Sequence, residues 1–346
     1  MLFFLMKNST KLLFLIILMT GSLMAISANS WMMAWMGLEI NLLSFIPLMN
    51  EINNLKSSES SLKYFLIQAL ASSILMFSII LSYMKTNMLF SLEFLNEYPN
   101  MMIISALILK CGAAPFHFWF PEVMEGLTWT NAMMLMTWQK LAPLVLISYT
   151  PNMSMLLSFI ILSTMIGALG GLNQTSMRKI MAFSSINHLG WILSAMYVNE
   201  KLWILYFMIY SFISINVAMM FNMYKLFHFN QLFSVMKFNS NLKIISMMNL
   251  LSLGGLPPFL GFIPKWLIIQ ELSCKMQMIT IFIMIMMTLI TLFFYMRMTF
   301  SALMLNYSQP ILMNNNYKNS MMNLYLLMSF ITLFSLPIIS MLYLMF

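Results

Sequence analysis

The chain has 346 residues, of which 61% are hydrophobic and only 8% are charged, and its formal net charge is +8. Soluble domains carry about 25% charged residues, so this composition excludes a soluble globular protein and predicts an integral membrane protein. The two cysteines, Cys111 and Cys274, lie in apolar segments, which favours small buried side chains over a disulfide framework. No basic stripe interleaved with aromatic residues is present, so no nucleic-acid partner is expected.

Apolar stretches follow one another along the whole chain and predict an all-α polytopic fold. A membrane-spanning helix needs about 20 apolar residues, and by this criterion we predict about eleven transmembrane helices. In chain order they cover 3–24, 30–49, 61–84, 100–124, 128–149, 153–172, 176–198, 202–226, 242–272, 277–304 and 321–344. The polar connections near 50–60, 85–99, 227–241 and 306–320 are short, so no separate water-soluble domain is expected.

The fourth and ninth of these spans carry one motif and are predicted to be broken. Gly112-x-x-Pro115-Phe116-x4-Pro121-Glu122 returns as Gly255-x-x-Pro258-Phe259-x4-Pro264-Lys265. Proline removes a backbone donor and clashes with the preceding turn of a helix. Loose backbone at membrane depth is tolerated only where it is buried in protein or lines a wet cavity.

Matching interruptions in two halves of a chain are typical of the repeats of secondary transporters, which indicates ion movement across a membrane. We therefore predict a single membrane domain with two inverted five-helix repeats, each with a proline-broken fourth helix. The first repeat covers 1–150 and the second 151–305, and a loop with a terminal helix covers 306–346.

The basic residues of the loops predict the orientation. Lysine and arginine collect in short loops on the side of synthesis. One side of the predicted topology holds most of them, namely Lys7, Lys11, Lys56, Lys63, Arg178, Lys179, Lys225, Lys237, Lys243 and Lys318, whereas the other holds Lys85, Lys201 and Lys275. The N-terminus is thus expected on the side of synthesis and the C-terminus on the far side. Arg297, which stays protonated, is expected to mark the end of its span.

Four ionisable residues fall deep inside predicted spans: Glu39, Lys110, Lys140 and Lys265. A charge at the centre of a span costs about 2.5–3.5 kcal/mol on insertion scales, and such residues commonly serve ion pathways. Burial brings the pKa of a lysine toward neutral pH, and a nearby carboxylate pushes it back up. The four residues therefore favour a proton relay, with Glu39 as the partner of Lys110. The competing interpretation is static pairing, or side chains that reach the interface.

Two histidines are further candidates. His188 lies in Ser184-Ser185-Ile186-Asn187-His188 on the seventh span and suits a link in a water chain. His117 lies within the first predicted break. For each of them, a hydrogen-bonded core histidine is an equally good interpretation. Glu122 and Glu125 follow the same break, and a solvated or interfacial position is expected for them in preference to a catalytic role.

Cofactor motifs are missing from the sequence. It contains no glycine-rich dinucleotide fingerprint, phosphate loop, Cys-x-x-Cys pair or haem-type histidine pair. We expect no redox, nucleotide or metal site in this chain itself, although bound lipids are compatible with it.

Several longer motifs resemble one family. They are Gly37-Leu38-Glu39, Lys63-Tyr64-Phe65-Leu66-Ile67-Gln68, Leu109-Lys110-Cys111-Gly112-Ala113-Ala114-Pro115-Phe116-His117-Phe118-Trp119, Thr137-Trp138-Gln139-Lys140-Leu141-Ala142-Pro143, Gly170-Gly171-Leu172-Asn173-Gln174-Thr175, Arg178-Lys179-Ile180, His188-Leu189-Gly190-Trp191 and Leu253-Gly254-Gly255-Leu256-Pro257-Pro258. In this order, and over nearly the whole length, the chain resembles the antiporter-like membrane subunits of mitochondrial NADH:ubiquinone oxidoreductase, respiratory complex I. The 44 methionines and the chain length resemble an insect mitochondrial product.

The resemblance implies a proton-translocating subunit in the membrane arm of complex I, in the mitochondrial inner membrane, with the N-terminus in the matrix and the C-terminus in the intermembrane space. It implies that NADH, FMN, iron–sulfur clusters and ubiquinone bind to other subunits, and that subunits 4L and 4 are neighbours. Glu39 and Lys110 match the family's glutamate–lysine pair, Lys140 its central lysine and Lys265 its terminal lysine.

The resemblance also predicts unequal halves, since Leu253 occupies the repeat position of Lys110 and Glu122 that of Lys265. Two alternatives stay open at this point: a stand-alone cation/proton antiporter, and a structural spacer without a proton path.

Overall fold

The structure is a computed structural model that describes residues 9–51, 54–86, 97–150, 153–231, 240–304 and 319–345. Within these ranges the chain is helical, with fourteen α-helices and only one isolated β-bridge, between Ser176 and His228. Residues 3–8 of the first predicted span, the loop cations Lys7, Lys237 and Lys318, and most of the predicted connections 85–99, 227–241 and 306–320 lie outside the described residues.

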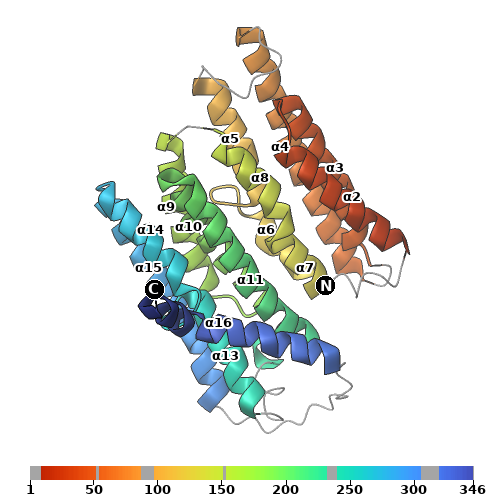
Figure 1. Ribbon diagram of the computed structural model, residues 1–346. Helices are drawn as coiled ribbons and strands as arrows, with labels where there is room; N and C mark the ends of the chain where they lie inside the picture. The colour runs from red at the N-terminus through yellow and green to blue at the C-terminus, as the bar shows by residue number, and fades with distance from the viewer. Residues whose placement is uncertain are drawn as a thin grey trace. The chain divides into compact units, whose positions relative to one another are not determined.

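The chain divides into two compact units, Met1–Phe159 and Ile160–Phe346. The first unit contains α2 (Ser9–Ile26), α3 (Trp31–Met49), α4 (Leu55–Thr86), α5 (Glu97–Cys111), α6 (Trp119–Gly126), α7 (Trp129–Met136) and α8 (Trp138–Ser148), with α2, α3 and α4 side by side (Figure 1). The boundary between the units falls within α9 (Met153–Gly171). The second unit continues with α10 (Met177–Val198), α11 (Glu200–Tyr224), α13 (Ser240–Gly254), α14 (Phe262–Cys274), α15 (Met278–Met304) and α16 (Asn319–Met345).

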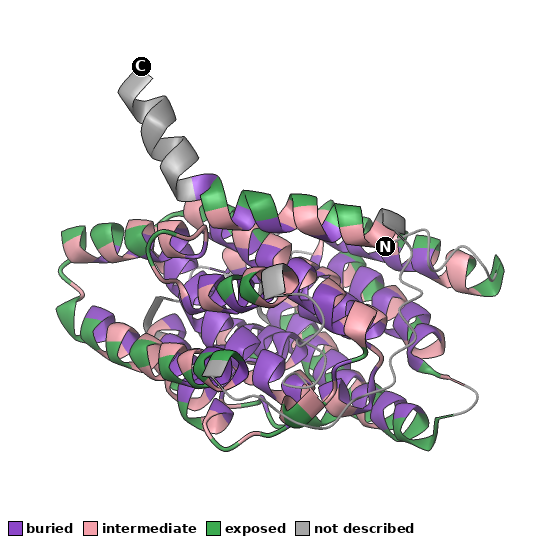
Figure 2. Ribbon diagram, turned by 90° about the horizontal axis from the view of Figure 1, so that it is seen from below, coloured by how far each residue is buried: buried purple, intermediate pink, exposed green. Residues whose placement is uncertain are grey.

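The helices are membrane-like in composition. Five of those described are long and apolar enough to cross a membrane: Ser9–Ile26, Trp31–Met49, Leu55–Met84, Glu200–Tyr224 and Met278–Leu303. Buried and exposed positions alternate along many helices (Figure 2), and many exposed positions carry large apolar side chains such as Leu70 and Phe282. Apolar side chains on an outward face suit contact with lipid.

Both predicted helix breaks are present. The first separates α5 from α6 at Gly112, whose φ is +74°, and the second separates α13 from α14 at Gly255, whose φ is +80°. The N–H of Ala113 donates to the Ile108 carbonyl, and that of Leu256 to the Leu251 carbonyl, five residues back in each case. This is the bond of a Schellman cap, which requires a left-handed residue and so favours glycine.

One predicted helix is interrupted instead of continuous. The span predicted at 128–149 consists of α7 and α8, which meet at Thr137 with φ −113° and ψ −71°. The Thr137 hydroxyl donates to the Met133 carbonyl at 2.8 Å, and such back-bonding bends helices. Pro143 inside α8 also lacks the N–H that would reach Gln139. The interruption places Gln139 and Lys140 in the first turn of a new helix.

The last helix is fixed by polar contacts within the second unit. In that unit α16 lies across α11 and α13 (Figure 1). Asn249 on α13 donates to the Tyr325 hydroxyl at 3.1 Å and accepts from the Thr332 hydroxyl at 2.6 Å. The N–H of Leu260, in the second break, donates to the Thr332 carbonyl at 3.2 Å. The backbone of the broken helix is therefore partly satisfied by the terminal helix.

We expect Gly255→Ala to lower the free energy of unfolding of the purified chain by about 1–2 kcal/mol, the cost of a side chain in the left-handed region. The new Cβ would also lie 2.8 Å from the Lys265 Nζ. The neighbouring Gly254→Ala is the matched control. Gly254 ends a helix, and its Cβ would meet nothing closer than 3.6 Å. Thermal unfolding in detergent should show a lower midpoint for Gly255→Ala only, and equal midpoints would contradict this account of the break.

Candidate functional site

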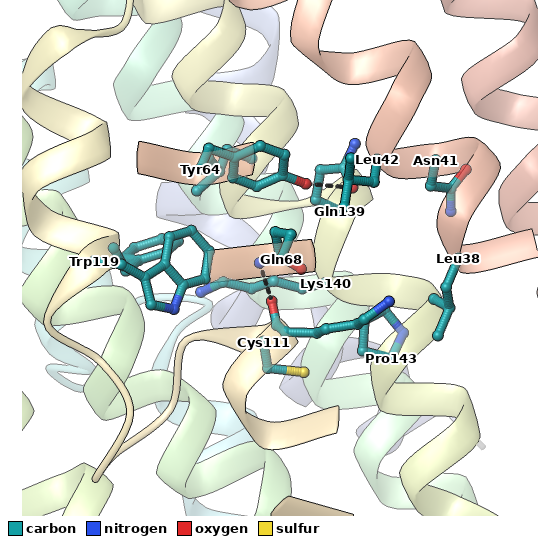
Figure 3. Close-up of a pocket in the computed structure, with 13 residues that line it drawn as sticks. Leu38, Asn41, Leu42, Tyr64, Gln68, Cys111, Trp119, Gln139, Lys140 and Pro143 are labelled. Carbon is teal, nitrogen blue, oxygen red and sulfur yellow. Dashed lines mark hydrogen bonds between the residues drawn. The ribbon is translucent and has the colours of Figure 1, made fainter. Parts of the chain in front are cut away.

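A small cavity in the first unit brings two of the predicted lysines together. Its volume is about 20 Å³. A water molecule needs about 10–15 Å³ by this measure, so the cavity has room for water. Its lining combines apolar and polar side chains from α3, α4, α5, α6, α7 and α8 (Figure 3): Leu38, Asn41, Leu42, Tyr64, Gln68, Lys110, Cys111, Trp119, Phe120, Leu135, Gln139, Lys140 and Pro143.

Helix interruptions place both lysines. Lys110 lies in the last turn of α5, directly before the first break, and Lys140 lies in the first turn of α8, after the interruption at Thr137. Both are buried, with exposed fractions of 7% and 2%. The Lys140 Nζ lies 4.7 Å from the centre of the Phe120 ring, a distance that suits a cation–π contact.

Neutral polar side chains from α3, α4 and α8 complete the cavity wall. The Gln68 amide donates to the Lys110 carbonyl at 3.4 Å, and the Tyr64 hydroxyl donates to the Gln139 side-chain carbonyl at 3.4 Å (Figure 3). Sequence reasoning assigned no role to these residues or to Asn41. Tyr64 and Gln68 are four residues apart in an apolar helix, so their spacing already placed them on one face.

Glu39 lies near this cavity but outside its lining. The residue is half-buried on α3, and one of its carboxylate oxygens is buried without a hydrogen-bond partner in the described part of the chain. Glu39 lies within electrostatic range of Lys110, yet the two form no ion pair among the described residues. Any link between Glu39 and Lys110 therefore needs water or a side-chain movement.

The described ion pairs lie elsewhere in this unit. Lys63 contacts Glu59 at 3.1 Å and Glu122 at 3.0 Å, and all three side chains are exposed. Glu122 thus has the solvated position that its sequence context suggested.

Lys265 occupies the second break. The residue is 6% exposed, and its Nζ donates to the Gly254 carbonyl at 2.9 Å, which is the carbonyl end of α13. A cation is favourable there because the helix dipole leaves a partial negative charge at that end. The same Nζ lies 5.9 Å from the centre of the Trp191 ring on α10.

His188 lies on α10, one turn before Trp191, and is buried among tyrosines of α11. Its Nδ1 is 2.8 Å from the Tyr206 hydroxyl, and its ring centre is 5.0 Å from that of Tyr210. This bond satisfies one ring nitrogen, as both a core histidine and a relay histidine with a fixed tautomer require. Sequence reasoning missed the two tyrosines, although their four-residue spacing places them on one helix face.

His117 has a local role in the first break. Its Nδ1 lies 3.2 Å from the Pro115 carbonyl and donates to it in the suitable tautomer, while its ring lies against Phe118. The described residues contain no group of three or more His, Cys, Asp and Glu side chains that could hold a metal ion. Both cysteines are free thiols.

Comparisons with known proteins confirm the resemblance seen in the sequence. Residues 28–292 match the family described as NADH:quinone oxidoreductase/Mrp antiporter, TM. NADH-ubiquinone oxidoreductase chain 2 of Anopheles gambiae is 56% identical over 341 residues, which cover 98% of this chain and 99% of the relative. The Locusta migratoria protein of the same name is 44% identical and covers 88% of each chain.

Solved structures show the same fold. A chain of respiratory complex I from Thermus thermophilus superposes with a TM-score of 0.86 at 21% identity and covers 95% of this chain and 78% of that one. A chain of the Mrp complex from Dietzia sp. gives a TM-score of 0.78 at 18% identity, over 86% of this chain and 61% of that one. With the family match and the two relatives, these likenesses agree with an all-helical membrane protein of antiporter-like fold. The chain belongs to the NADH:quinone oxidoreductase/Mrp antiporter membrane family and, within it, to the NADH-ubiquinone oxidoreductase chain 2 proteins.

Proposed function

We propose that this chain, as a membrane-arm subunit of NADH-ubiquinone oxidoreductase, carries protons through its buried lysines while other subunits transfer electrons from NADH to ubiquinone. Family membership supports the assignment to the enzyme. The observation that carries the proton path is the cavity of about 20 Å³ lined by both Lys110 and Lys140.

The first unit supplies the parts of a relay. Lys110 and Lys140 line the same small cavity, and a water molecule held there would offer a route for a proton between them. Glu39 acts on Lys110 from outside the cavity and favours its charged form when the carboxylate approaches.

The second unit supplies a different set of groups. Lys265 at the second break and His188 on α10 are the proposed relay residues, with Tyr206 as a positioning residue. A histidine nitrogen that is held by a hydrogen bond fixes the tautomer of the ring, and this decides which nitrogen can accept a proton. The Tyr206 hydroxyl makes that bond at 2.8 Å.

The proposal also covers the number of transmembrane spans, their arrangement in repeats and the orientation of the termini. We propose about eleven spans in two inverted five-helix repeats over 1–150 and 151–305, followed by a loop and terminal helix. The two glycine-capped breaks support the repeat. The loop cations support an N-terminus in the mitochondrial matrix and a C-terminus in the intermembrane space of the inner membrane.

We further propose that the chain lies beside subunits 4L and 4 and that redox cofactors bind to other subunits of the complex. The sequence signatures of the chain support this assignment, as they resemble the membrane-arm family, and none of them is a nucleotide or cluster motif.

The alternative function is a structural spacer without a proton path, and an experiment must distinguish it from the proton relay. In an assembled complex that carries Lys140→Met, we expect fewer protons pumped per NADH oxidised, because methionine keeps the bulk of lysine but cannot carry a proton. Proton uptake or release and NADH oxidation are measured together in proteoliposomes that contain the complex.

Lys201→Met is the matched control. Lys201 is an exposed lysine in the first turn of α11, so its loss should leave the proton-to-electron ratio unchanged. A normal ratio in an assembled Lys140→Met complex would support the spacer and remove Lys140 from the path.

For Tyr206→Phe we expect coupled turnover to fall roughly two- to tenfold, the equivalent of one neutral hydrogen bond. If the hydroxyl acts only through His188, the same substitution should have no further effect in a His188→Gln background. The measurement is proton pumping and its pH dependence for both single variants and the double variant. Additive losses would show that Tyr206 does not act through His188.

A further inference from the structure

A second and larger cavity lies in the second unit, apart from the buried lysines. Its volume is about 830 Å³, within the range of about 300–1,000 Å³ that is common for small-molecule sites. It is lined by residues of the α9–α10 loop, of the segment after α11 and of the last turns of α15: Leu172, Asn173, Gln174, Thr175, His228, Phe229, Asn230, Arg297 and Ser301.

Backbone and side-chain hydrogen bonds hold the cavity walls in place. The N–H of Phe229 donates to the Thr175 carbonyl at 3.1 Å, and the N–H of Met177 donates to the Phe227 carbonyl at 2.9 Å. Arg297 reaches across from α15 and donates through Nη2 to the Leu172 carbonyl at 2.8 Å. Three segments that are distant in the sequence are thus joined around one space.

The lining has the chemistry of an anion site. Its described residues supply a guanidinium, two asparagine amides, a glutamine amide, two hydroxyl groups and an imidazole, and none of them is a carboxylate. A guanidinium presents several N–H donors in a planar fork that matches the oxygens of a phosphate, and only one of its nitrogens is needed for Leu172. Leu172 and Phe229 add an apolar part.

The position of the cavity favours a lipid as the source of the bound anion. It lies where α9 ends, α10 begins, and α11 and α15 end, which is one end of four apolar helices. This end also carries Arg178 and Lys179 in the first turn of α10 and Lys225 at the C-cap of α11. Basic pockets at such helix ends suit the headgroups of anionic lipids, whose phosphates lie at that depth.

We propose that this cavity binds the phosphate-bearing headgroup of an anionic phospholipid, with Arg297 as the principal phosphate ligand. The amides and hydroxyl groups contact the remaining headgroup oxygens, and Leu172 and Phe229 contact the start of the acyl chains. A free phosphate ion offers the same oxygens but leaves most of the volume and the apolar part without a partner. The proposal rests on the membrane placement of these helices and not on the proton path.

The test uses the full-length chain, purified in detergent and delipidated, with phosphatidylglycerol and phosphatidylcholine of identical acyl chains as probes. Native mass spectrometry counts the lipids bound across a titration. We expect phosphatidylglycerol to bind more tightly, and Arg297→Gln to weaken that binding at least about tenfold, because hydrogen bonds to charged groups are the strong ones.

Lys225→Gln is the control for general attraction to basic residues, since Lys225 lies exposed at the same end but outside the lining. It should leave the binding unchanged. Ser301→Phe is the second variant, which places a bulky side chain in the cavity wall one turn from Arg297 without changing charge and keeps the test valid if Arg297→Gln does not fold. It should abolish the tight phosphatidylglycerol site.

Competition with inorganic phosphate distinguishes a lipid headgroup from a free phosphate ion as the ligand of this cavity. If phosphate displaces phosphatidylglycerol only at large excess, the lipid is the ligand. Displacement at equal concentration would assign the site to free phosphate and overturn the proposal. Equal binding of both lipids, or equal losses in Arg297→Gln and Lys225→Gln, would also overturn it.

Discussion

The structure depends on one constraint: in lipid, every backbone N–H and C=O must find its partner inside the protein. Helices that end inside a predicted span, as α5 and α13 do, violate this rule unless their last carbonyls are covered. At the first break, Trp119 donates to the Leu109 carbonyl at 3.2 Å and Gln68 donates to the Lys110 carbonyl. At the second break, the ammonium group of Lys265 covers the Gly254 carbonyl. The groups that complete the backbone are therefore the same groups that surround the buried charges.

The two breaks are capped by different groups, and this gives the two halves different chemistry. Neutral side chains cap the first break, so the lysine beside it is left to line a water-sized cavity with Lys140. In the second break the lysine is itself the cap, and loss of its proton would weaken a contact that holds the helix end. Equal proton traffic through both halves is not expected from this geometry. The asymmetry follows from the exchange of two residues between the repeats, where Leu253 and Glu122 replace the lysines.

The sequence was sufficient for features that depend on residue type and order. Glycine with proline predicted both breaks, and the depth of Lys110, Lys140 and Lys265 in apolar runs predicted their burial. The interruption at Thr137 was not predicted, because apolar residues flank it on both sides and the side-chain bond that accompanies it is local. The Tyr206–His188 bond was not predicted either, since it needs the approach of α10 and α11. Proximity of Glu39 to Lys110 was expected, but the sequence could not show that a gap separates them.

The central claim is that Lys110 and Lys140 act in sequence on one proton path. The most direct measurement is the proton-to-electron ratio of assembled complexes that carry Lys110→Met, Lys140→Met or both. Groups that act as a unit lose nearly the whole effect when either one is removed. We predict that each single variant loses as many protons per NADH as the double variant. A shared path would be contradicted if the loss of protons per NADH in the double variant equals the sum of the losses in the two single variants. It would also be contradicted by a normal ratio in any of the three complexes.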